Sequence, residues 1–293
     1  MTRKMQRRSV YLIAVAVALL LFFALPYLLP HAATPRTAVD AGCLEIHVID
    51  VGQGDAVLLR SAQATVLVDC GTNESERALS AYLSRLRVEH LDYLILSHPH
   101  EDHMGGADMI LRELDVDTVL LPDVIPEEDI GAQLAAAYAA SDAIVRTAAA
   151  GDVFTVDEMT VTVLSPPEQC FEQMNDNSLV LRVTHGDTAL LLTGDAEEAV
   201  EQYLLTTYGA QGLDCDLLKA GHHGSQTSSS EELLKALTPT YVAISCGKGN
   251  PYGHPMQQVL DRIAAVGARA CRTDREGSLV FVSDGKTLVL RTK

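Results

Sequence analysis

Residues 97–103 read Ser-His-Pro-His-Glu-Asp-His and follow directly after a short apolar run, so three imidazoles lie close to an acidic side chain. Neutral imidazole is the commonest metal-binding side chain, and this density of ligands predicts a metal site. The intervening proline biases His98 towards extended geometry, in which residues two positions apart point the same way. We therefore expect His98 and His100 to hold one ion, while Asp102 and His103 remain for another.

Two aspartates end further apolar runs that read as buried strands. Asp69 follows the run 66–68 and could orient a metal-binding histidine, although an aspartate shortly before a glycine is equally typical of a turn. Asp195 follows the run 190–192, and we expect its carboxylate to be shared by two ions.

Two more histidine segments come after predicted strands. His222 and His223 stand between glycines after the run 217–219, and His254 lies in a loop after another strand. An ordinary surface loop remains an alternative interpretation of each segment. Either His222 or His223 could be the metal ligand, and His254 could take the place of either.

The remaining pattern predicts the elements that carry these residues, including a helix that begins with a capping box of Asn73 and Glu76. The expected strands cover 44–49, 56–60, 65–68, 94–96, 118–121, 153–156, 160–164, 179–184, 189–192, 216–219 and 240–245, and the expected helices cover about 75–86, 105–114, 128–140, 197–208, 231–237 and 257–266. Strands cluster first and then alternate with helices, in two similar halves. This order predicts an α/β fold in which two sheets pack together with helices outside.

The chain is strongly acidic, with a formal net charge of −17 over 293 residues. The first 30 residues hold four basic side chains and no acid, so the remainder is even more acidic than the whole. Such a field repels polyanions and counts against tight nonspecific binding to nucleic acid. A nuclease whose metal ions hold the phosphate is not excluded.

The amino-terminal segment 1–30 predicts a membrane anchor or a signal segment, because residues 10–29 are mainly apolar and are preceded by basic residues. We favour an uncleaved transmembrane helix, with its basic flank in the cytoplasm and the rest of the chain outside the membrane. Cleavage would instead make the protein secreted. Residues 31–42 read as a linker and residues 43–293 as one domain. The six cysteines form no Cys-x-x-Cys pair, and a lipid-modified Cys43 is a weak alternative.

Seven short segments together resemble the metallo-β-lactamase superfamily, and they are most like the extracytoplasmic hydrolase domain of ComEC competence proteins. The segments are Asp-Val-Gly-Gln-Gly-Asp-Ala at 50–56, Asp-Cys-Gly at 69–71, the histidine segment through Gly106, Asn-Asp-Asn-Ser at 175–178, Thr-Gly-Asp-Ala at 193–196, Gly-His-His-Gly-Ser at 221–225 and Tyr-Gly-His-Pro at 252–255. The resemblance covers residue 44 to the carboxyl end. It implies a four-layer αββα sandwich with a dinuclear metal site between the sheets.

The resemblance implies two divalent ions, zinc or manganese. In this hypothesis one ion is held by His98, His100 and Asp195, and the other by Asp102, His103, Asp195 and His222. Many superfamily members place a further histidine ligand where this chain has residues 175–178, so the first ion is expected to have an open or weak position. ComEC proteins also carry a multi-helix channel, whereas this chain has one apolar span, so we expect DNA transport to need a separate channel protein.

The resemblance favours a metal-dependent phosphodiesterase or nuclease, with a phosphoester substrate such as DNA. Two ions would activate a water molecule and neutralise phosphoryl charge. The expected roles are catalysis by Asp102, His223 and His254, and substrate binding by Gln53, Asp55, Asn177 and Ser225. A hydrolase of small phosphoesters, such as cell-wall phosphorylcholine, and a non-catalytic metal-binding scaffold are the alternatives.

Overall fold

The computed structural model describes residues 38–124 and 128–291, and it divides the chain into two units at residues 1–38 and 39–293. The fold reported below is that of the second unit. The predicted amino-terminal anchor lies outside the described residues, as does most of the predicted linker. Within 38–124 and 128–291, no helix combines the length and the apolar character that a membrane crossing requires.

The first sheet has eight strands in the order β15-β14-β1-β2-β3-β4-β5-β6. Strands β3 to β6 run parallel to one another, and the other neighbours are antiparallel. Their bounds are β1 Leu44–Val48, β2 Val57–Arg60, β3 Thr65–Val68, β4 His90–Ile95, β5 Asp115–Leu121, β6 Ile144–Thr147, β14 Leu279–Ser283 and β15 Leu288–Leu290.

The second sheet has seven strands in the order β13-β12-β11-β10-β9-β8-β7. Here β10 to β13 are parallel, whereas β7 to β10 form antiparallel pairs. Their bounds are β7 Val153–Val156, β8 Met159–Ser165, β9 Val180–His185, β10 Thr188–Leu192, β11 Leu217–Lys219, β12 Tyr241–Ile244 and β13 Arg269–Arg272.

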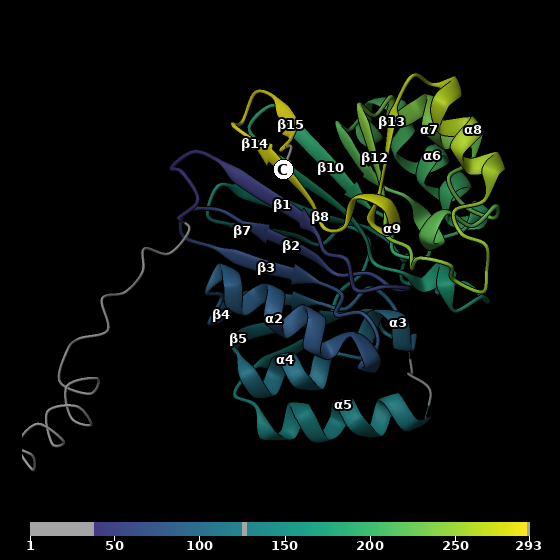
Figure 1. Ribbon diagram of the computed structural model, residues 1–293. Helices are drawn as coiled ribbons and strands as arrows, with labels where there is room; N and C mark the ends of the chain where they lie inside the picture. Colours follow the sequence, from purple (N-terminus) through teal and green to yellow (C-terminus); the bar gives the residue numbers. More distant parts are fainter. Residues whose placement is uncertain (1–37, 125–127, 292–293) are drawn as a thin grey trace, which may run out of the picture. The chain divides into compact units, whose positions relative to one another are not determined.

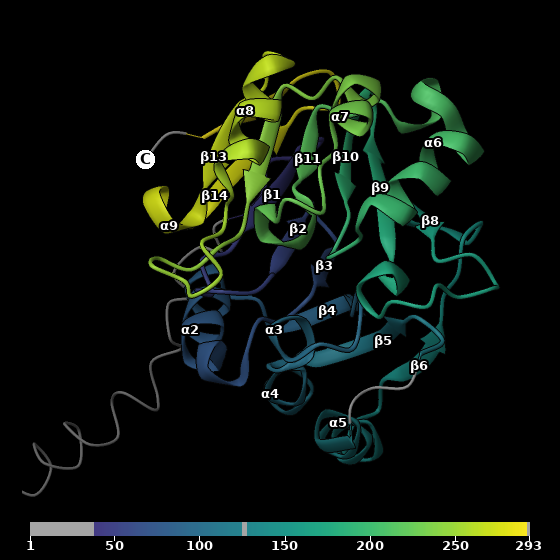
Figure 2. The same cartoon turned by 90° about the vertical axis from the view of Figure 1, so that its right-hand side faces the viewer.

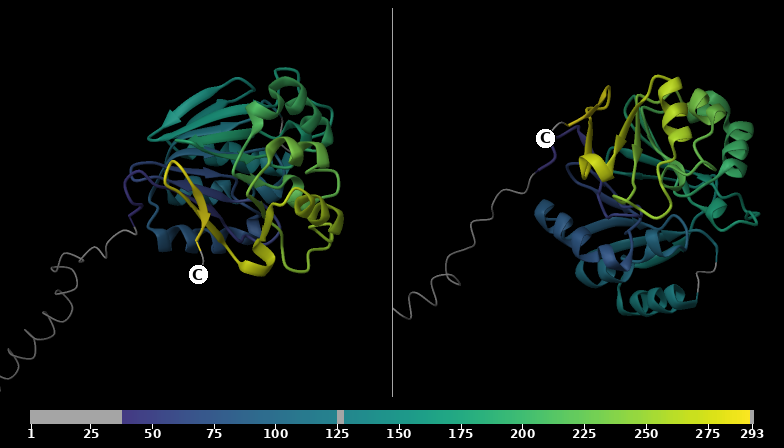
Figure 3. Two further views of the ribbon diagram at one scale, coloured as in Figure 1. Left: turned by 90° about the horizontal axis from the view of Figure 1, so that it is seen from above. Right: turned by 45° about the vertical axis from the view of Figure 1, so that its right-hand side comes forward.

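Helices cover the outer face of each sheet, as Figures 1 and 3 show. Helices α2, α4 and α5 pack on the first sheet, and α6, α7 and α8 pack on the second. The helices are α2 Glu76–Leu86, α3 Glu101–Met104, α4 Ala107–Glu113, α5 Glu128–Ala140, α6 Glu198–Leu213, α7 Glu231–Leu237, α8 Gln257–Ala265 and α9 Thr273–Glu276, and the short 3₁₀ turns are η1 Asn73–Ser75, η2 Asn175–Asn177 and η3 Gly221–Gly224.

Alternation along the strands explains the layers, because successive side chains of a strand point to opposite faces. In β10, Leu190 and Leu192 join the core between the sheets, whereas Leu191 joins the core beneath the helices of the second sheet. In β3, Leu67 likewise faces the helices of the first sheet. The predicted α/β architecture of two packed sheets with outer helices is therefore confirmed.

Three local predictions differ from the structure. The predicted capping box is absent: Thr72 caps the turn η1 by accepting from Ser75 N at 3.1 Å, and Asn73 N donates to Glu101. The edge strand β6 was not predicted. It is short and begins shortly after a polar stretch, so no long apolar run marks it. Helix α6 continues past its predicted end through a kink at Gly209, whose φ of 63° lies in the left-handed region.

The parallel strands position the candidate ligands. The carboxyl ends of β3 and β4, neighbours in the first sheet, and of β10 and β11, neighbours in the second, deliver the segments that hold Asp69, the histidine run, Asp195 and the histidine pair. Figure 2 shows α3, which follows β4, at the side where the loops after β10 and β11 also lie. The last three residues of the histidine run, predicted as loop, lie in this helical turn α3.

Candidate metal centre

Asp69 holds the histidine segment in place by bonding two of its residues, Ser97 and His103. Its carboxylate accepts hydrogen bonds from the backbone N–H and the hydroxyl of Ser97, both at 2.7 Å, and its Oδ2 lies 2.8 Å from His103 Nδ1. These contacts hold Asp69 in left-handed geometry, at φ 60°, which an aspartate adopts only at a cost. Because Nδ1 of His103 is engaged, its Nε2 is aimed into the centre. This is the orienting position that the sequence predicted for Asp69.

His98 and His100 approach each other closely, as the extended geometry at His98 predicted. Nε2 of His98 and Nδ1 of His100 lie 3.1 Å apart. Burial, reinforced by the nearby His103, lowers the pKa of His98 well below its ordinary value, so its imidazole is neutral and able to bind a metal ion.

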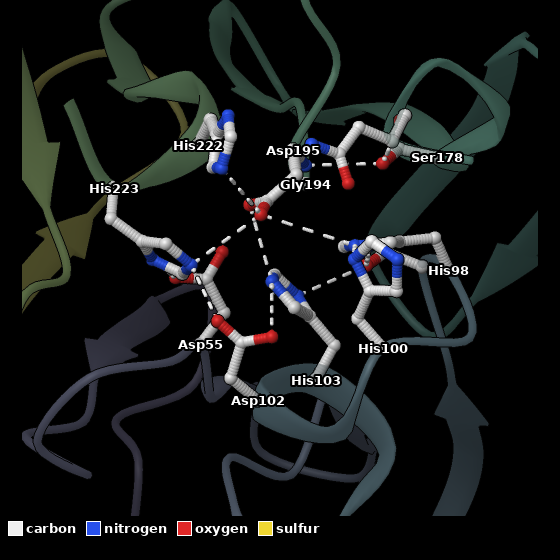
Figure 4. A network of polar contacts seen from close by, with 12 residues as sticks. Asp55, His98, His100, Asp102, His103, Ser178, Gly194, Asp195, His222 and His223 are labelled. Carbon is white, nitrogen blue, oxygen red and sulfur yellow. Dashed lines mark hydrogen bonds and ion pairs between the residues drawn. The ribbon is translucent and has the colours of Figure 1, made fainter. Parts of the chain in front are cut away.

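Asp195 is the carboxylate on which the imidazoles converge (Figure 4). Its Oδ1 lies 3.1 Å from His103 Nε2, and its Oδ2 lies 3.5 Å from His223 Nε2, 3.8 Å from His222 Nε2 and 3.9 Å from His98 Nε2. One carboxylate therefore faces imidazoles from both halves of the sandwich, as expected for a ligand shared by two ions.

The turn before Asp195 requires glycine. Gly194 has φ 51°, and a Cβ there would lie 2.9 Å from Ser178 Oγ. The same hydroxyl accepts a hydrogen bond from Asp195 N at 3.1 Å. Ser178 thus positions the backbone that presents the shared carboxylate.

The histidine pair occupies the turn η3, in which His222 and His223 both have left-handed backbone, with φ of 47° and 54°. This geometry directs the two rings differently. His223 is buried, and its Nε2 lies 3.1 Å from Asp102 Oδ2. His222 is partly exposed, and its Nδ1 lies 2.9 Å from Glu197 Oε1. The Nε2 atoms of both rings face Asp195, so the choice between His222 and His223 as the metal ligand stays a prediction.

Asp55 enters the centre, although the sequence predicted that it binds substrate. Its side chain is buried, forms an ion pair with Lys219 through Oδ2, and places Oδ1 3.3 Å from His223 Nδ1. Such a side chain is shielded from substrate. Together with His103, Asp195 and His223 it forms a group, here called the buried cluster, in which one potential ligand atom of each residue lies within 4.8 Å of the others.

The buried cluster fits a cation. Asp55 Oδ1, His103 Nε2 and Asp195 Oδ1 are buried, and none of them completes a hydrogen bond within the described part of the chain. Unpaired buried polar atoms are costly and rare, and a metal ion would satisfy all three. Nitrogen and carboxylate oxygen donors suit divalent ions such as zinc or manganese without distinguishing between them.

The charges in the centre are strongly coupled. Burial opposes protonation of His103 and His223, but Asp195 and the neighbouring carboxylates outweigh it and raise both pKa values well above the ordinary value. Burial likewise opposes ionisation of Asp55, but Lys219 and His223 outweigh it and lower its pKa to about 2. The pKa values of Asp102 and Asp195 are also lowered by these imidazoles, against the effect of burial. In the metal-free protein, the protonated imidazoles therefore supply the positive charge that a bound metal ion would otherwise supply.

We expect zinc to stabilise the protein more as the pH rises. The raised pKa values of His103 and His223 stabilise the metal-free fold fully below the ordinary pKa of about 6.5, and this contribution is lost as pH rises through the folded-state values. Metal binding requires neutral imidazoles, so it strengthens over the same range. Melting temperatures measured with and without zinc should diverge as the pH rises above about 6.5. A constant difference would contradict the assignment of these imidazoles.

Three residues predicted to bind substrate have hydrogen-bond partners within the protein. Asn177 is buried, and its amide donates to Phe171 O and Gln173 O, each at 3.0 Å, and accepts from Phe171 N at 2.7 Å. These bonds tie its amide to its own loop, and its role in binding substrate stays a prediction. Ser225 Oγ bonds with Thr227 Oγ1 at 2.9 Å, and Gln53 Oε1 accepts from Gly247 N at 3.1 Å. Both side chains tie loops together beside the centre.

His254 lies at the edge of the centre rather than within the buried cluster. Its ring is half-buried and contacts the ring of His222 at a centroid distance of 5.7 Å. Its Nδ1 is buried and has no hydrogen-bond partner in the described chain. Burial and the adjacent histidines lower its pKa, so it is available as a neutral base or a further ligand.

Two participants were missed by sequence reasoning. Lys219 ends an apolar strand, where a charged residue is unusual unless it is paired, and this was the available signal. Glu197, which contacts His222, follows the Gly-Asp motif by two positions but has no pattern of its own.

Comparison with known proteins identifies the chain's relatives. The family model of the metallo-beta-lactamase superfamily matches residues 49–248. ComE operon protein 3 of Bacillus subtilis (strain 168) is 31% identical over 255 residues, which cover 81% of this chain and 33% of that protein. Competence protein ComA of Neisseria gonorrhoeae is 35% identical over 247 residues, covering 83% of this chain and 33% of that protein. The chain thus spans about a third of the length of these curated relatives.

Solved structures share the fold at low sequence identity. The metallo-beta-lactamase fold protein YhfI from Bacillus subtilis superposes with a TM-score of 0.54 at 14% identity, covering 82% of this chain and 99% of that one. CmlA, a diiron beta-hydroxylase from Streptomyces venezuelae, gives a TM-score of 0.54 at 15% identity, covering 78% of this chain and 52% of that one. These likenesses establish the fold only, because a shared fold does not fix chemistry.

Proposed function

Since this chain belongs to the metallo-beta-lactamase superfamily, whose members share a hydrolase fold, we propose that it is a metal-dependent phosphodiesterase, with nucleic acid as its substrate. The observation that carries this proposal is the buried cluster, in which one ligand atom from each of two carboxylates and two imidazoles lies within 4.8 Å of the others, and three of these residues have a buried atom that completes no hydrogen bond within the described residues. The similarity to competence proteins, named above, supports nucleic acid as the substrate.

The residues divide into two groups around Asp195. His98 and His100 lie on one side of it, and Asp102, His103 and His223 lie on the other, so each group could hold one divalent ion. Bound divalent ions supply a water of lowered pKa and neutralise charge on phosphoryl oxygens.

Histidine side chains of the protein, rather than the bound ions, are the candidates for proton transfer. His223 Nε2 is paired with Asp102 at 3.1 Å, and His254 stands at the exposed rim with a depressed pKa. We assign to His254, as the neutral base, the acceptance of a proton from the attacking water, because His223 is enclosed within the buried cluster. Rim placement gives His254 the access to substrate that His223 lacks.

A hydrolase of small phosphoesters, such as phosphorylcholine, is the second candidate. The net charge of −17 favours it, because an acidic surface repels a long polyanion more than a small ester. A cluster of bound cations would offset this repulsion locally for either substrate.

We also propose that the hydrolase domain works outside the membrane, held by the segment 1–30 and served by a separate DNA-transport channel. The basic residues before the apolar run 10–29 support this orientation.

The test is hydrolysis by the full chain, loaded separately with zinc and with manganese, of single-stranded DNA, duplex DNA, a chromogenic phosphodiester and a choline phosphoester. We expect phosphodiester cleavage, and we expect Asp102→Asn to reduce its rate by about 10²- to 10⁴-fold, because Asp102 holds His223 and offers a ligand oxygen. Asp108→Asn, six positions further on and paired with Arg112 on helix α4, is the matched control.

Three outcomes would contradict the proposal. Full activity in Asp102→Asn would show that the proposed mechanism is wrong. Hydrolysis of the choline phosphoester alone would select the second candidate. Tight metal binding without hydrolysis of any substrate would indicate a metal-binding scaffold.

A further inference from the structure

A row of rings leads from the protein surface to the buried cluster. Tyr252 is 61% exposed, and its ring stacks on that of His254 at a centroid distance of 5.7 Å and an interplanar angle of 26°. His254 then contacts His222 at 5.7 Å, and His222 contacts His223 at 6.1 Å. Nothing in the proposed hydrolysis uses Tyr252, although it stands at the outer end of this row.

The loop that presents Tyr252 is held in a fixed shape. The side chain of Asn250 donates to Gly247 O at 2.9 Å and to His254 O at 2.6 Å, and it accepts from His254 N at 3.0 Å. Gln53 accepts from Gly247 N and so ties this loop to the β1–β2 loop that carries Asp55. An aromatic side chain on such a loop loses little conformational entropy when a ligand binds.

We propose that Tyr252 is a stacking site for a nucleobase of the substrate, beside the cleaved phosphodiester bond. This inference deepens the proposed phosphodiesterase function, and it makes single-stranded nucleic acid the substrate class. The inner face of the ring rests on His254, while the exposure of Tyr252 leaves ring surface open for stacking. Lys248, exposed in the same loop, adds a positive charge for the adjacent phosphate.

The geometry favours an unpaired base over the other ligands. A base within a duplex is already stacked on its neighbours, so Tyr252 can stack only on a base that is unpaired. Quaternary ammonium groups are bound by cages of several aromatic rings. Within residues 38–124 and 128–291, the ring contact recorded for Tyr252 is with His254 alone, and a single flat platform suits a base rather than choline.

A binding experiment tests the inference without requiring catalysis. The chain contains no tryptophan, so Tyr252→Trp introduces a single indole at the proposed site. With metal bound and with phosphorothioate linkages that resist cleavage, we expect a thymidine oligonucleotide to quench its fluorescence. An abasic oligonucleotide of equal length should bind about tenfold or more weakly and leave the emission unchanged. Val289→Trp, at an exposed position of β15, is the control and should respond to neither.

The inference is overturned if the normal and abasic oligonucleotides give the same response, if neither binds, or if choline phosphate alone quenches the indole. A kinetic readout separates stacking from a merely structural role. Tyr252→Leu should raise KM for single-stranded DNA about tenfold with little change in kcat, and Tyr252→Phe should restore KM. If no phosphodiester is hydrolysed, the proposed function fails, but base-dependent quenching would still establish the stacking site.

Discussion

Asp195→Asn is expected to abolish tight binding of at least one metal ion and, with it, hydrolysis. The side chain keeps its shape but loses the negative charge that faces the imidazoles of both halves of the sandwich. Replacing a residue that merely supports a metal ligand costs about 10- to 100-fold in affinity or activity, and we expect a larger loss for a shared ligand. Titration with zinc, followed by elemental analysis and rate measurement, gives the result.

Asp187→Asn is the matched control for this experiment. Asp187 is an exposed aspartate just before strand β10, whereas Asp195 follows the same strand at its other end. The substitution at 187 removes the same charge from the same hairpin without touching the centre, so metal content and rate should be unchanged. An Asp195→Asn protein that retains both metal stoichiometry and rate would remove the basis for a shared carboxylate.

The ligands most readily predicted from the sequence are those at the carboxyl ends of parallel strands. Asp69, the histidine run and Asp195 each follow an apolar run, and the structure brings these three segments together. Strand direction determines the positions of Asp69 and the histidine run, because β3 and β4 are parallel neighbours that present their carboxyl ends at one edge of the first sheet. Asp195 follows a strand of the second sheet and reaches them through the packing of the two sheets. Local sequence therefore carried most of the information about these residues.

Contacts made across the sandwich could not be predicted in the same way. Asp55 lies in a loop before β2, and it reaches the centre because the packing of the sheets places it against Lys219 of the opposite sheet. The directions in which the rings of His222 and His223 point depend on the left-handed backbone of both residues. The sequence does not encode this geometry by a local rule. Asn177 carried a plausible residue type for phosphate binding, but its buried loop uses its whole amide.

Lys219→Met is expected to destabilise the metal-free protein by about 3–5 kcal/mol, the cost of removing one partner from a buried ion pair. Lys219 is 1% exposed, forms an ion pair with Asp55 and lies 3.4 Å from Gly194 O. Methionine fills a similar volume, so the loss measures the uncompensated charge of Asp55 rather than a cavity. Denaturant unfolding in chelator at neutral pH is the measurement, and Lys235→Met, which breaks an exposed pair with Glu231, should change almost nothing.

The pH dependence and a second substitution identify the cause of this loss. The pKa of Asp55, lowered to about 2, contributes stability that is present above its unfolded-state pKa of about 4 and is lost as pH falls through the folded-state value. Without Lys219 that pKa should rise, so the variant can protonate Asp55, and its deficit should shrink on acidification. Asp55→Asn added to Lys219→Met should recover part of the stability at neutral pH, because no buried charge is then left unpaired. A deficit that is unchanged by pH and by the second substitution would mean that Lys219 stabilises the strand end by packing alone.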